Sequence, residues 1–300
     1  MPRSGAVLFS FFRGISVNLV LLQGGKHVLD HRGGAGLAGQ CAALAPALDT
    51  PDDALLAPLD GFLRARYFSA EFRDAYLLPL CSGFSGRPAH ALLQAPAAAA
   101  LRLWHHHGLP TLGGASPWRG VAGGTRRVVQ ALLAELADAR LSTPVRQLAR
   151  DGQGLRLVTD TQVERFDAVV LACHSDQALA LLADPSAAET EVLGAIPYQA
   201  NETVLHTDAR LLPTRRKAWA AWSAYVPAEP GAACTVSYCM NLLQGIDAPE
   251  PLVVTLNRSE AIDPARVIAR MRYAHPVYDA AMVAAQGRRN AIQGQRCTWY

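Results

Sequence analysis

Lysine is almost absent from this chain of 300 residues and occurs only at Lys26 and Lys217. Arginine therefore makes up nearly all of the 28 basic residues, which are scattered along the sequence, and the net charge is only +3. A protein that tracks nucleic-acid phosphates shows a concentrated basic face. The composition therefore predicts no nucleic-acid partner.

The chain also lacks paired cysteines. Its six cysteines form no Cys-x-x-Cys pair and no Cys/His spacing of the kind that holds zinc. Several lie in apolar runs, where a free cysteine behaves as a small buried side chain. We therefore predict a reduced, cytoplasmic protein without a metal ion. The run His105-His106-His107 does not alter this prediction, because adjacent residues of a helix point in different directions.

A long uninterrupted apolar run is missing as well. The N-terminal run over residues 6–22 is broken by Arg13, whereas a membrane helix needs about 20 apolar residues. The same arginine shortens the core that a signal peptide would need. We therefore predict no membrane span, and the 50% hydrophobic content is enough for the core of one or two domains.

Helix signals recur along the chain. Ser69 is a suitable N-cap for a helix that ends at Pro79, and an Ala- and Leu-rich run predicts a second helix over residues 91–107. A third helix is predicted from an N-cap at Thr125 to about residue 139. Its apolar stripe consists of Val128, Val129, Leu132, Leu133 and Leu136. Shorter helices are predicted after Ser175 or Asp176, after the capping box Ser186–Glu189, and from Asp263-Pro264 through Met271.

Strand signals are concentrated after the third helix. Residues 144–149 and 155–158 predict a hairpin, and the continuous apolar run 167–172 predicts a strand buried on both faces. Further strands are predicted at 203–206, 234–240 and 252–256. The fold class predicted from this pattern is α/β followed by α+β, which suits a nucleotide-binding domain with a substrate domain.

One stretch has a characteristic order of motifs. The Gly123-Gly124 turn precedes a helix, a hairpin that opens on Thr143-Pro144-Val145, and a strand that ends on Ala172-Cys173-His174. This order resembles the flavin-containing amine oxidase and phytoene desaturase superfamily, and in particular a bacterial group of predicted NAD/FAD-binding, amine-oxidase-like proteins. Further matching motifs follow in order over residues 59–300: Tyr76-Leu77-Leu78-Pro79, Tyr198-Gln199-Ala200-Asn201, Leu211-Leu212-Pro213, Met240-Asn241-Leu242-Leu243-Gln244-Gly245 and Tyr273-Ala274-His275-Pro276.

The resemblance implies a partial FAD/NAD(P)-binding Rossmann-like domain joined to an amine-oxidase-type substrate domain. Residues 59–115 would be the helical part of the substrate domain, 116–185 part of the FAD-binding domain, and 186–290 the rest of the substrate domain. Residues 291–300 would start the last strand of the FAD-binding domain. Residues 1–58 show no clear period and receive no assignment.

The resemblance also implies the cofactor FAD and the residues around it. The Gly123-Gly124 turn would lie near the flavin domain, and the main chain of Val145 would meet the adenine. Ala172 and Cys173 would border the cofactor where the family usually has Ala-Thr-Pro, and Trp299 would lie on the last flavin-domain strand. The sequence identifies no catalytic residue. His174-Ser175-Asp176 is not a triad, because sequence neighbours cannot converge as a relay requires.

In the family, the flavin-binding domain also has an N-terminal dinucleotide fingerprint and a C-terminal flavin-binding segment after the strand that Trp299 would start. We predict that this chain lacks both. The sextet Gly34–Gly39 is the one candidate for the fingerprint. It matches Gly-x-Gly-x-x-Gly, but residues 26–32 make a poor buried strand, Pro46 interrupts the next helix, and no acidic residue ends a second strand. We therefore predict that this sextet is not the fingerprint. On this interpretation the chain is a fragment that binds FAD weakly or not at all.

Three functions remain open from the sequence. The first is an FAD-dependent oxidoreductase that transfers a hydride from a C–N or C–C bond of a small amine or lipid-like substrate to flavin. The second is a non-catalytic truncated paralogue or interaction domain that does not bind FAD. The third is a lipid or polyene desaturase- or isomerase-like flavoprotein. Fold-level analogy does not choose among their substrates.

Overall fold

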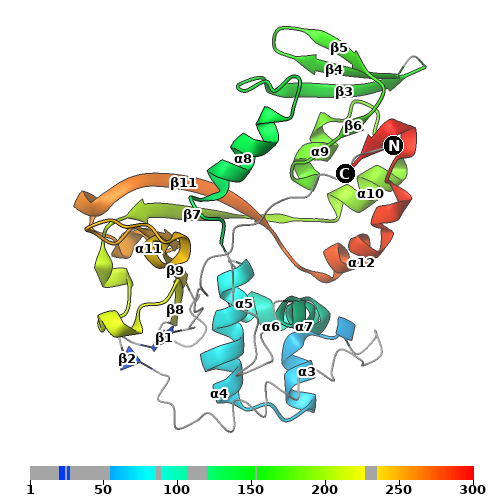
Figure 1. The fold of residues 1–300 in the computed structure, drawn as a ribbon. Helices are drawn as coiled ribbons and strands as arrows, with labels where there is room; N and C mark the ends of the chain where they lie inside the picture. The colour runs from blue at the N-terminus through cyan, green and yellow to red at the C-terminus, as the bar shows by residue number, and fades with distance from the viewer. Residues whose placement is uncertain are drawn as a thin grey trace. The chain divides into compact units, whose positions relative to one another are not determined.

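The computed structural model describes residues 20–23, 26–27, 55–85, 89–106, 120–152, 154–226 and 235–300. The chain forms two compact units, whose elements are labelled in Figure 1. Unit 1 comprises residues 1–136 and 200–275, and unit 2 comprises residues 137–199 and 276–300. The sextet Gly34–Gly39 and His107, the last residue of the helix predicted over 91–107, lie outside the described residues.

Unit 1 contains a group of helices, and the predicted cap at Ser69 is confirmed. Helix α3 spans Leu59–Ala65, and α4, Ala70–Phe72, follows Ser69. The Ser69 hydroxyl accepts a hydrogen bond of 3.1 Å from the backbone N–H of Phe72. This bond satisfies one of the N–H groups that a helix start leaves without a partner.

The prediction that Pro79 ends this helix is wrong. A π-helical turn, Arg73–Leu77, leads directly into α5, Leu78–Ser85, which contains the proline near its start. Inside an α-helix the proline ring crowds the carbonyl four residues earlier. The N–H of Leu78 donates to the carbonyl of Arg73, five residues back. This wider turn accommodates the ring, so the helix continues.

The single helix predicted over residues 91–107 is instead two helices. α6 spans Ala89–Gln94 and α7 spans Ala97–His106. Pro96 disfavours the helical conformation at the residue before it. The break directs the carbonyl of Ala95 to the N–H of Leu59, at 2.9 Å, and ties these helices to the start of α3.

Helix α8 is shorter and more exposed than predicted. It spans Thr125–Ala134, its N-cap is Gly124 rather than Thr125, and no side chain caps it. The predicted apolar stripe is present, but exposed fractions range from 36% for Val128 to 58% for Leu136. Within the described residues, none of the hydrophobic clusters includes this stripe. The period predicted a helix correctly but did not predict its burial.

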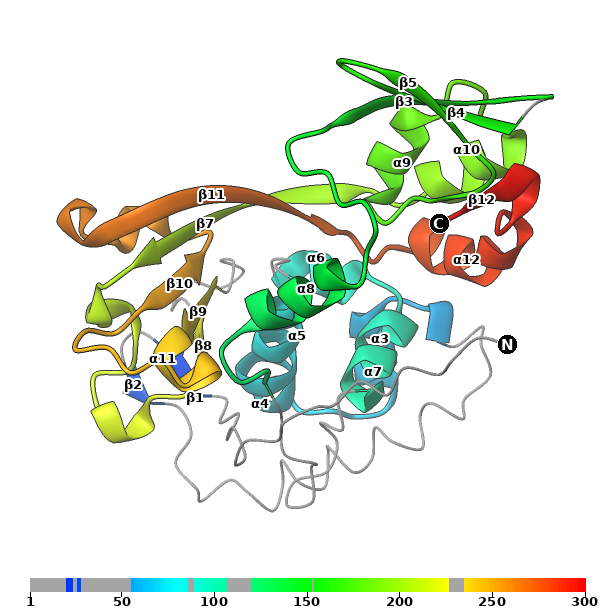
Figure 2. The ribbon, with the colours of Figure 1, turned by 45° about the horizontal axis from the view of Figure 1, so that its top comes forward.

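A seven-stranded sheet forms the rest of unit 1, and the predicted strands near residues 203, 235 and 253 are confirmed. Its order is β11-β7-β10-β9-β8-β1-β2, and β7 and β11 run side by side in Figure 2. The strands are β1 Val20–Gln23, β2 Lys26–His27, β7 Tyr198–His206, β8 Trp222–Val226, β9 Thr235–Cys239, β10 Val253–Leu256 and β11 Val267–Pro276. The short helix α11, Met240–Gln244, follows β9 directly.

The helix predicted from Asp263 through Met271 is wrong. Asp263 does cap a turn, because its carboxylate accepts a hydrogen bond from the N–H of Ala265, but the turn ends at Arg266. β11 follows, and over residues 267–272 its half-buried and exposed residues alternate. This alternation is the period of a strand. The cap at Asp263 does not distinguish a single helical turn from a longer helix, because both begin in the same way.

The helices cover one face of the sheet. Helix α5 packs on β8 and β9, and Trp222 and Val236 of these strands join the helical residues Phe72, Leu77 and Leu101 in one buried cluster. Side chains alternate along a strand, so the next residues, Ser223 and Ser237, belong to the other face. That face contains buried polar groups as well as small apolar clusters.

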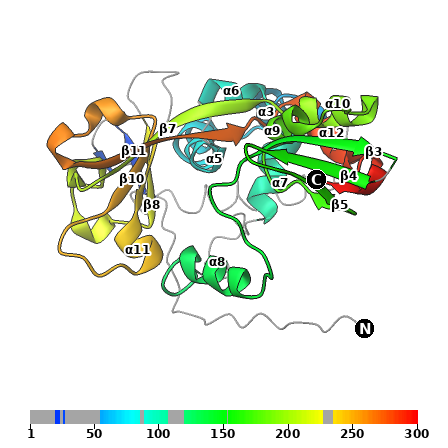
Figure 3. The same ribbon diagram turned by 90° about the horizontal axis from the view of Figure 1, so that it is seen from above.

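Unit 2 contains the predicted hairpin, which is confirmed and extended by one strand. β3, Val145–Asp151, pairs with β4, Gly154–Thr159, and β4 pairs with β5, Val163–Phe166 (Figure 3). The helices are α9, Ser175–Leu181, α10, Ala187–Gly194, and α12, Ala280–Arg288. Leu148, Leu155, Val192, Leu193, Ala285 and Ile292 form the buried core of this unit.

The strand predicted to be buried on both faces is wrong in extent and in burial. β6 contains only Val169–Val170 and pairs in parallel with β12, Thr298–Trp299. Val170 is 70% exposed and its register partner Trp299 is 39% exposed. Apolar runs predict two-sided burial because parallel strands normally lie inside larger sheets. Here the described residues form a sheet of two strands.

Candidate functional site

The Gly123-Gly124 turn has a backbone that only glycine adopts easily. The N–H of Gly124 donates to the carbonyl of Val121 at 3.0 Å, and φ is 78° at Gly123. This is the left-handed value that the third position of a type II turn needs. Gly124 has φ 80° and ψ 167°, a region that is essentially restricted to glycine. The backbone conformation therefore explains why both positions are glycine.

The surroundings of the two glycines differ. A Cβ on Gly123 would lie 2.7 Å from Nε of Arg127, whose side chain packs over the turn. A Cβ on Gly124 would meet only Oε1 of Gln244, at 4.0 Å. The turn is thus open on the side of Gly124, and Gln244 of α11 is its neighbour there. No local motif pairs Gln244 with this turn, because the two lie about 120 positions apart.

The expected cofactor residues of unit 2 lie in two sheets. The N–H of Leu171 donates to the carbonyl of Trp299 at 2.9 Å, so Ala172 and Cys173 follow directly from the strand beside Trp299. Ala172 and Cys173 are exposed. Val145 lies elsewhere, at the start of β3, where a bulge shifts the register. The structure therefore brings together three of the expected residues in unit 2.

His174 and Ser175 continue from this edge into α9. The N-cap of α9 is His174, not Ser175 or Asp176 as predicted, and no side chain caps the helix. The phenol oxygen of Tyr198 accepts a hydrogen bond of 2.9 Å from the N–H of Ser175, and its ring stacks on His174 with centroids 4.4 Å apart. Tyr198 thus takes the place of a capping side chain.

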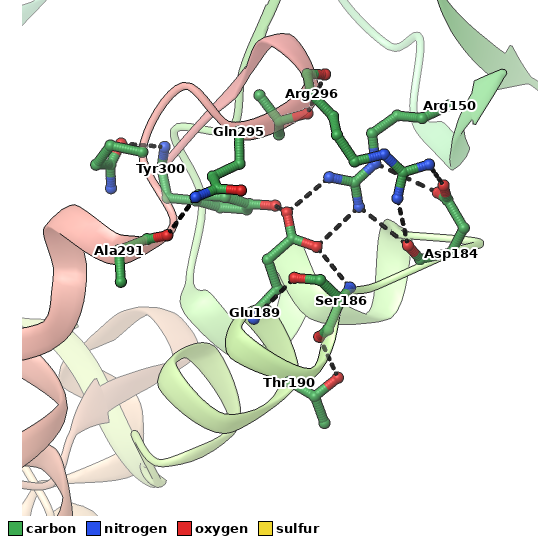
Figure 4. A network of polar contacts seen from close by, with 11 residues as sticks. Arg150, Asp184, Ser186, Glu189, Thr190, Ala291, Gln295, Arg296 and Tyr300 are labelled. Carbon is green, nitrogen blue, oxygen red and sulfur yellow. Dashed lines mark hydrogen bonds and ion pairs between the residues drawn. The ribbon is translucent and has the colours of Figure 1, made fainter. Parts of the chain in front are cut away.

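The most strongly buried charges of unit 2 form an ion pair between β3 and α10 (Figure 4). Nη1 and Nη2 of Arg150 donate to the two carboxylate oxygens of Glu189 at 2.6 and 3.0 Å. The side chains are only 3% and 1% exposed. Such a fork-to-fork pair is stronger and more directional than a single hydrogen bond.

The same carboxylate binds the end of the chain. The hydroxyl of Tyr300 donates to Oε1 of Glu189 at 2.5 Å, and the N–H of Ser186 donates to Oε2 at 2.7 Å. The Ser186 hydroxyl accepts from the N–H of Glu189, so the predicted capping box is confirmed. Glu189 therefore joins β3, the start of α10 and the residue that follows β12.

These contacts determine the ionisation of the cluster. Burial raises the pKa of Glu189, but the hydrogen bonds from Arg150, Tyr300 and Ser186 outweigh it and hold the pKa at about 2. Burial and the neighbouring Glu189 both raise the pKa of Tyr300. At neutral pH the carboxylate is therefore charged and the phenol keeps its proton.

Unit 1 contains a separate row of buried, hydrogen-bonded polar side chains across its sheet. Ser237 and Thr255 share a hydrogen bond of 2.8 Å, and Thr255 contacts Nε2 of His206 at 2.8 Å. Nδ1 of His206 accepts from the N–H of Asp208 at 3.1 Å. Burial lowers the pKa of His206, although Asp208 opposes this effect. His206 is therefore neutral, with its proton on Nε2.

Some kinds of site are not found in the described residues. No group of three or more His, Cys, Asp or Glu residues there could hold a metal ion. No described helix is long and apolar enough to cross a membrane. The side chains of His105 and His106 lie outside the described part.

Comparison with protein families shows to which family the chain belongs. The sequence profile described as "Flavin containing amine oxidoreductase" matches residues 34–218. The chain belongs to this family. The resemblance predicted from the motif order is therefore confirmed, and members of the family bind FAD. The match begins at the sextet Gly34–Gly39, whose role stays a prediction. No curated protein matches the chain.

Solved structures show the same fold. The chain is similar to a CLA-producing fatty acid isomerase from P. acnes, with TM-score 0.66 and 16% identity over 96% of this chain and 75% of that one. It is similar to putrescine oxidase bound to putrescine, with TM-score 0.62 and 12% identity over 94% and 75%. Cyclohexylamine oxidase from Brevibacterium oxydans IH-35A gives TM-score 0.58 and 14% identity over 92% and 74%. The predicted mixed α/β fold is thus confirmed at the level of the family.

Proposed function

We propose that the chain acts as an FAD-dependent oxidoreductase of the amine oxidase type. The observation that supports this, beyond family membership, is the β6–β12 pair. It leaves the apolar side chains of Val170 and Trp299 exposed on one face, just before Ala172 and Cys173. Ligands of α/β sheets bind at the carboxyl ends of parallel strands, so this edge suits a flat, largely apolar ring system.

The described residues fit such a group. The side chains of Ala172 and Cys173 are small. We propose that these two residues, with Val145 and Trp299 of the same unit, would hold FAD. The place of the Gly123-Gly124 turn near the flavin domain stays a prediction from the resemblance. When bound, FAD supplies a hydride acceptor for a C–N or C–C bond. The contribution of this chain is to bind and orient the group, and no side chain is proposed as a catalytic acid or base.

The decisive experiment is a visible spectrum of the purified full chain after incubation with FAD and desalting. We expect flavin absorbance to be retained in Val170→Asp less than in the unchanged chain, because a charge would cover the apolar face. Leu141→Asp is the matched control, since Leu141 is also highly exposed in unit 2. Equal retention by both variants would contradict the proposed edge. Flavin retained by the unchanged chain would overturn the prediction of weak or absent FAD binding, and Gly34–Gly39 would have to be reconsidered as a phosphate loop.

The exposed stripe on α8 favours a second candidate function. A colourless chain would indicate a non-catalytic paralogue or interaction domain that keeps the family fold without FAD. The exposed apolar side chains of α8 are of the kind that mark an interaction surface. The same spectrum therefore separates the two candidates.

The substrate class is a further part of the proposal. The similar structures include amine oxidases and a fatty acid isomerase, so we propose a small amine or a lipid-like molecule. Lasting anaerobic bleaching of the flavin by an amine would support the oxidase, and lasting bleaching by an unsaturated fatty acid would support a desaturase-like flavoprotein. An isomerase returns the hydride to its substrate, so a shifted double bond without lasting bleaching would support that alternative. We further propose a reduced, cytoplasmic setting, in which Cys81, Cys173, Cys239 and Cys297 would not form disulfides.

A further inference from the structure

Arg258 of unit 1 has an unusual environment for a charged side chain. Its guanidinium carbon lies 3.4 Å from the centroid of the Tyr225 ring, and the residue is half-buried. Within the described residues, Arg258 donates no side-chain hydrogen bond and forms no ion pair. A guanidinium has five N–H donors, and none of those of Arg258 has an acceptor among the described residues.

The carboxylates near Arg258 do not neutralise it. Glu202 accepts hydrogen bonds from Arg270 at 3.1 Å and from the hydroxyl of Ser259 at 2.5 Å. Burial lowers the pKa of Arg258, and the charges of Tyr225 and Glu260 oppose this effect only in part. The side chain thus carries a partly desolvated positive charge that has no ion-pair partner in the described part of the chain.

The backbone that carries Arg258 is firmly held. Asn257, just before it, has the left-handed φ of 54°. Its amide donates to Oδ1 of Asn201 at 2.7 Å, and its own Oδ1 accepts from the N–H of Glu202 at 3.0 Å. Asn201 in turn contacts Nδ1 of His275 at 2.7 Å. The position of Arg258 is therefore fixed by bonds between β7, β11 and the end of β10.

Tyr225 is fixed independently by the sheet. It lies near the end of β8 and pairs in register with Thr235 of β9. Arg258, which follows β10, reaches across β9 to this ring. Stacking holds the plane of the guanidinium against the ring, and its N–H groups lie in that plane. The arrangement resembles the way in which arginine is prepared to receive a planar anion.

We propose that Arg258, stacked on Tyr225, is an anion-binding site for the carboxylate or phosphate group of a small ligand. Two parallel N–H···O bonds from the guanidinium would hold either group. The site is assigned from residues of unit 1 alone, and it does not depend on the binding of FAD. It extends the proposed function by giving the chain a means of recognising an anionic head group.

The test is calorimetric titration of the full chain with octanoate, octylamine and inorganic phosphate. Octanoate and octylamine share a chain length and differ in charge, so we expect octanoate to bind and octylamine not to bind. Binding of inorganic phosphate would identify a phosphate ester as the natural group, and binding of octanoate alone would identify a carboxylate. The proposal would be overturned if octanoate and octylamine bound equally well, or if neither octanoate nor phosphate bound.

Variants locate the site. Arg258→Gln should weaken binding by about tenfold or more, because it removes the charge-assisted hydrogen bonds. Arg258→Lys keeps the charge but loses the planar fork, so its affinity should be intermediate. Arg272→Gln, which removes an exposed arginine of the same unit, is the control and should bind as the unchanged chain does. Equal affinity of Arg258→Gln and this control would refute the assignment even if the anion binds.

Discussion

Replacing Glu189 with glutamine tests whether the buried ion pair stabilises unit 2. The change keeps the size of the side chain and removes its charge, so Arg150 faces a neutral amide while remaining 3% exposed. Removing one partner of a buried pair costs about 3–5 kcal/mol. Asp184, 3.4 Å from Nε of Arg150, offsets part of this cost. We therefore expect a loss near the lower end, about 3 kcal/mol, in the stability of unit 2.

The assay is hydrogen exchange measured by mass spectrometry. Peptides from β3 and α10 report the opening of unit 2, and peptides from the sheet of unit 1 serve as an internal reference. Tyr300→Phe removes one hydrogen bond to the same carboxylate and should cost about 1.5–3 kcal/mol. The control is Glu191→Gln, on the same helix, because Glu191 pairs with Arg288 in an exposed position and surface pairs contribute little.

The pH dependence gives a second readout of the same reasoning. The pKa of Glu189 is about 2 in the folded chain, below the value of about 4.3 for an unfolded glutamate. Its contribution is therefore complete above the unfolded value and is lost as pH falls toward 2. Glu189→Gln should flatten this acid limb. If Glu189→Gln changed exchange in unit 2 no more than Glu191→Gln does, the ion pair would not be the stabilising contact inferred here.

Three further perturbations test other parts of the structure. Burial lowers the pKa of His206 in the folded chain, so the unfolded chain takes up a proton first as pH falls below about 6.5, and unit 1 should lose stability there. His206→Gln should remove this loss, measured by hydrogen exchange of the β7 and β10 peptides. An unchanged pH profile of exchange in this variant would contradict the prediction. Gly124→Ala should destabilise unit 1 by about 1–3 kcal/mol in a urea titration, because of the backbone conformation at that position. Gly61→Ala, inside α3, should not destabilise it, because nothing lies within 4 Å of the added Cβ. Burial raises the pKa of the Cys81 thiol to about 12, so alkylation followed by mass spectrometry should modify the exposed Cys297 long before Cys81, and similar rates would show that α5 opens readily.

Local signals explain which elements were predictable. The caps at Ser69 and Ser186 depend on residues three positions away, so the sequence displays both partners together. Asp263 shows the limit of this reasoning, because its cap belongs to a single turn and the following residues form β11. Pro79 shows another limit, because the π-helical turn that accommodates it leaves no mark in the sequence.

The candidate site was less predictable, because its contacts join distant positions. Arg150 and Glu189 are separated by 39 positions, and Glu189 and Tyr300 by 111. The capping box identified Glu189 only as a partner of Ser186. Burial of the strand that includes Val170 depends on how many neighbours its sheet has, which an apolar run does not specify. Arg258 looked like any other arginine until the register placed it across β9 from Tyr225.

The boundary between the two units lies within two strands, β7 and β11, so the part of unit 1 between them is an insertion in unit 2. The boundary falls within β7, at 199/200, and within β11, at 275/276, so residues 200–275 interrupt unit 2. On the side of unit 2, the N–H of Val277 donates to the carbonyl of Pro197 at 2.8 Å. The two cut ends are therefore neighbours, and a short glycine linker could replace the whole insertion. A gene assembled in this way would encode unit 2 as one continuous chain, which no simple truncation of the present sequence can do.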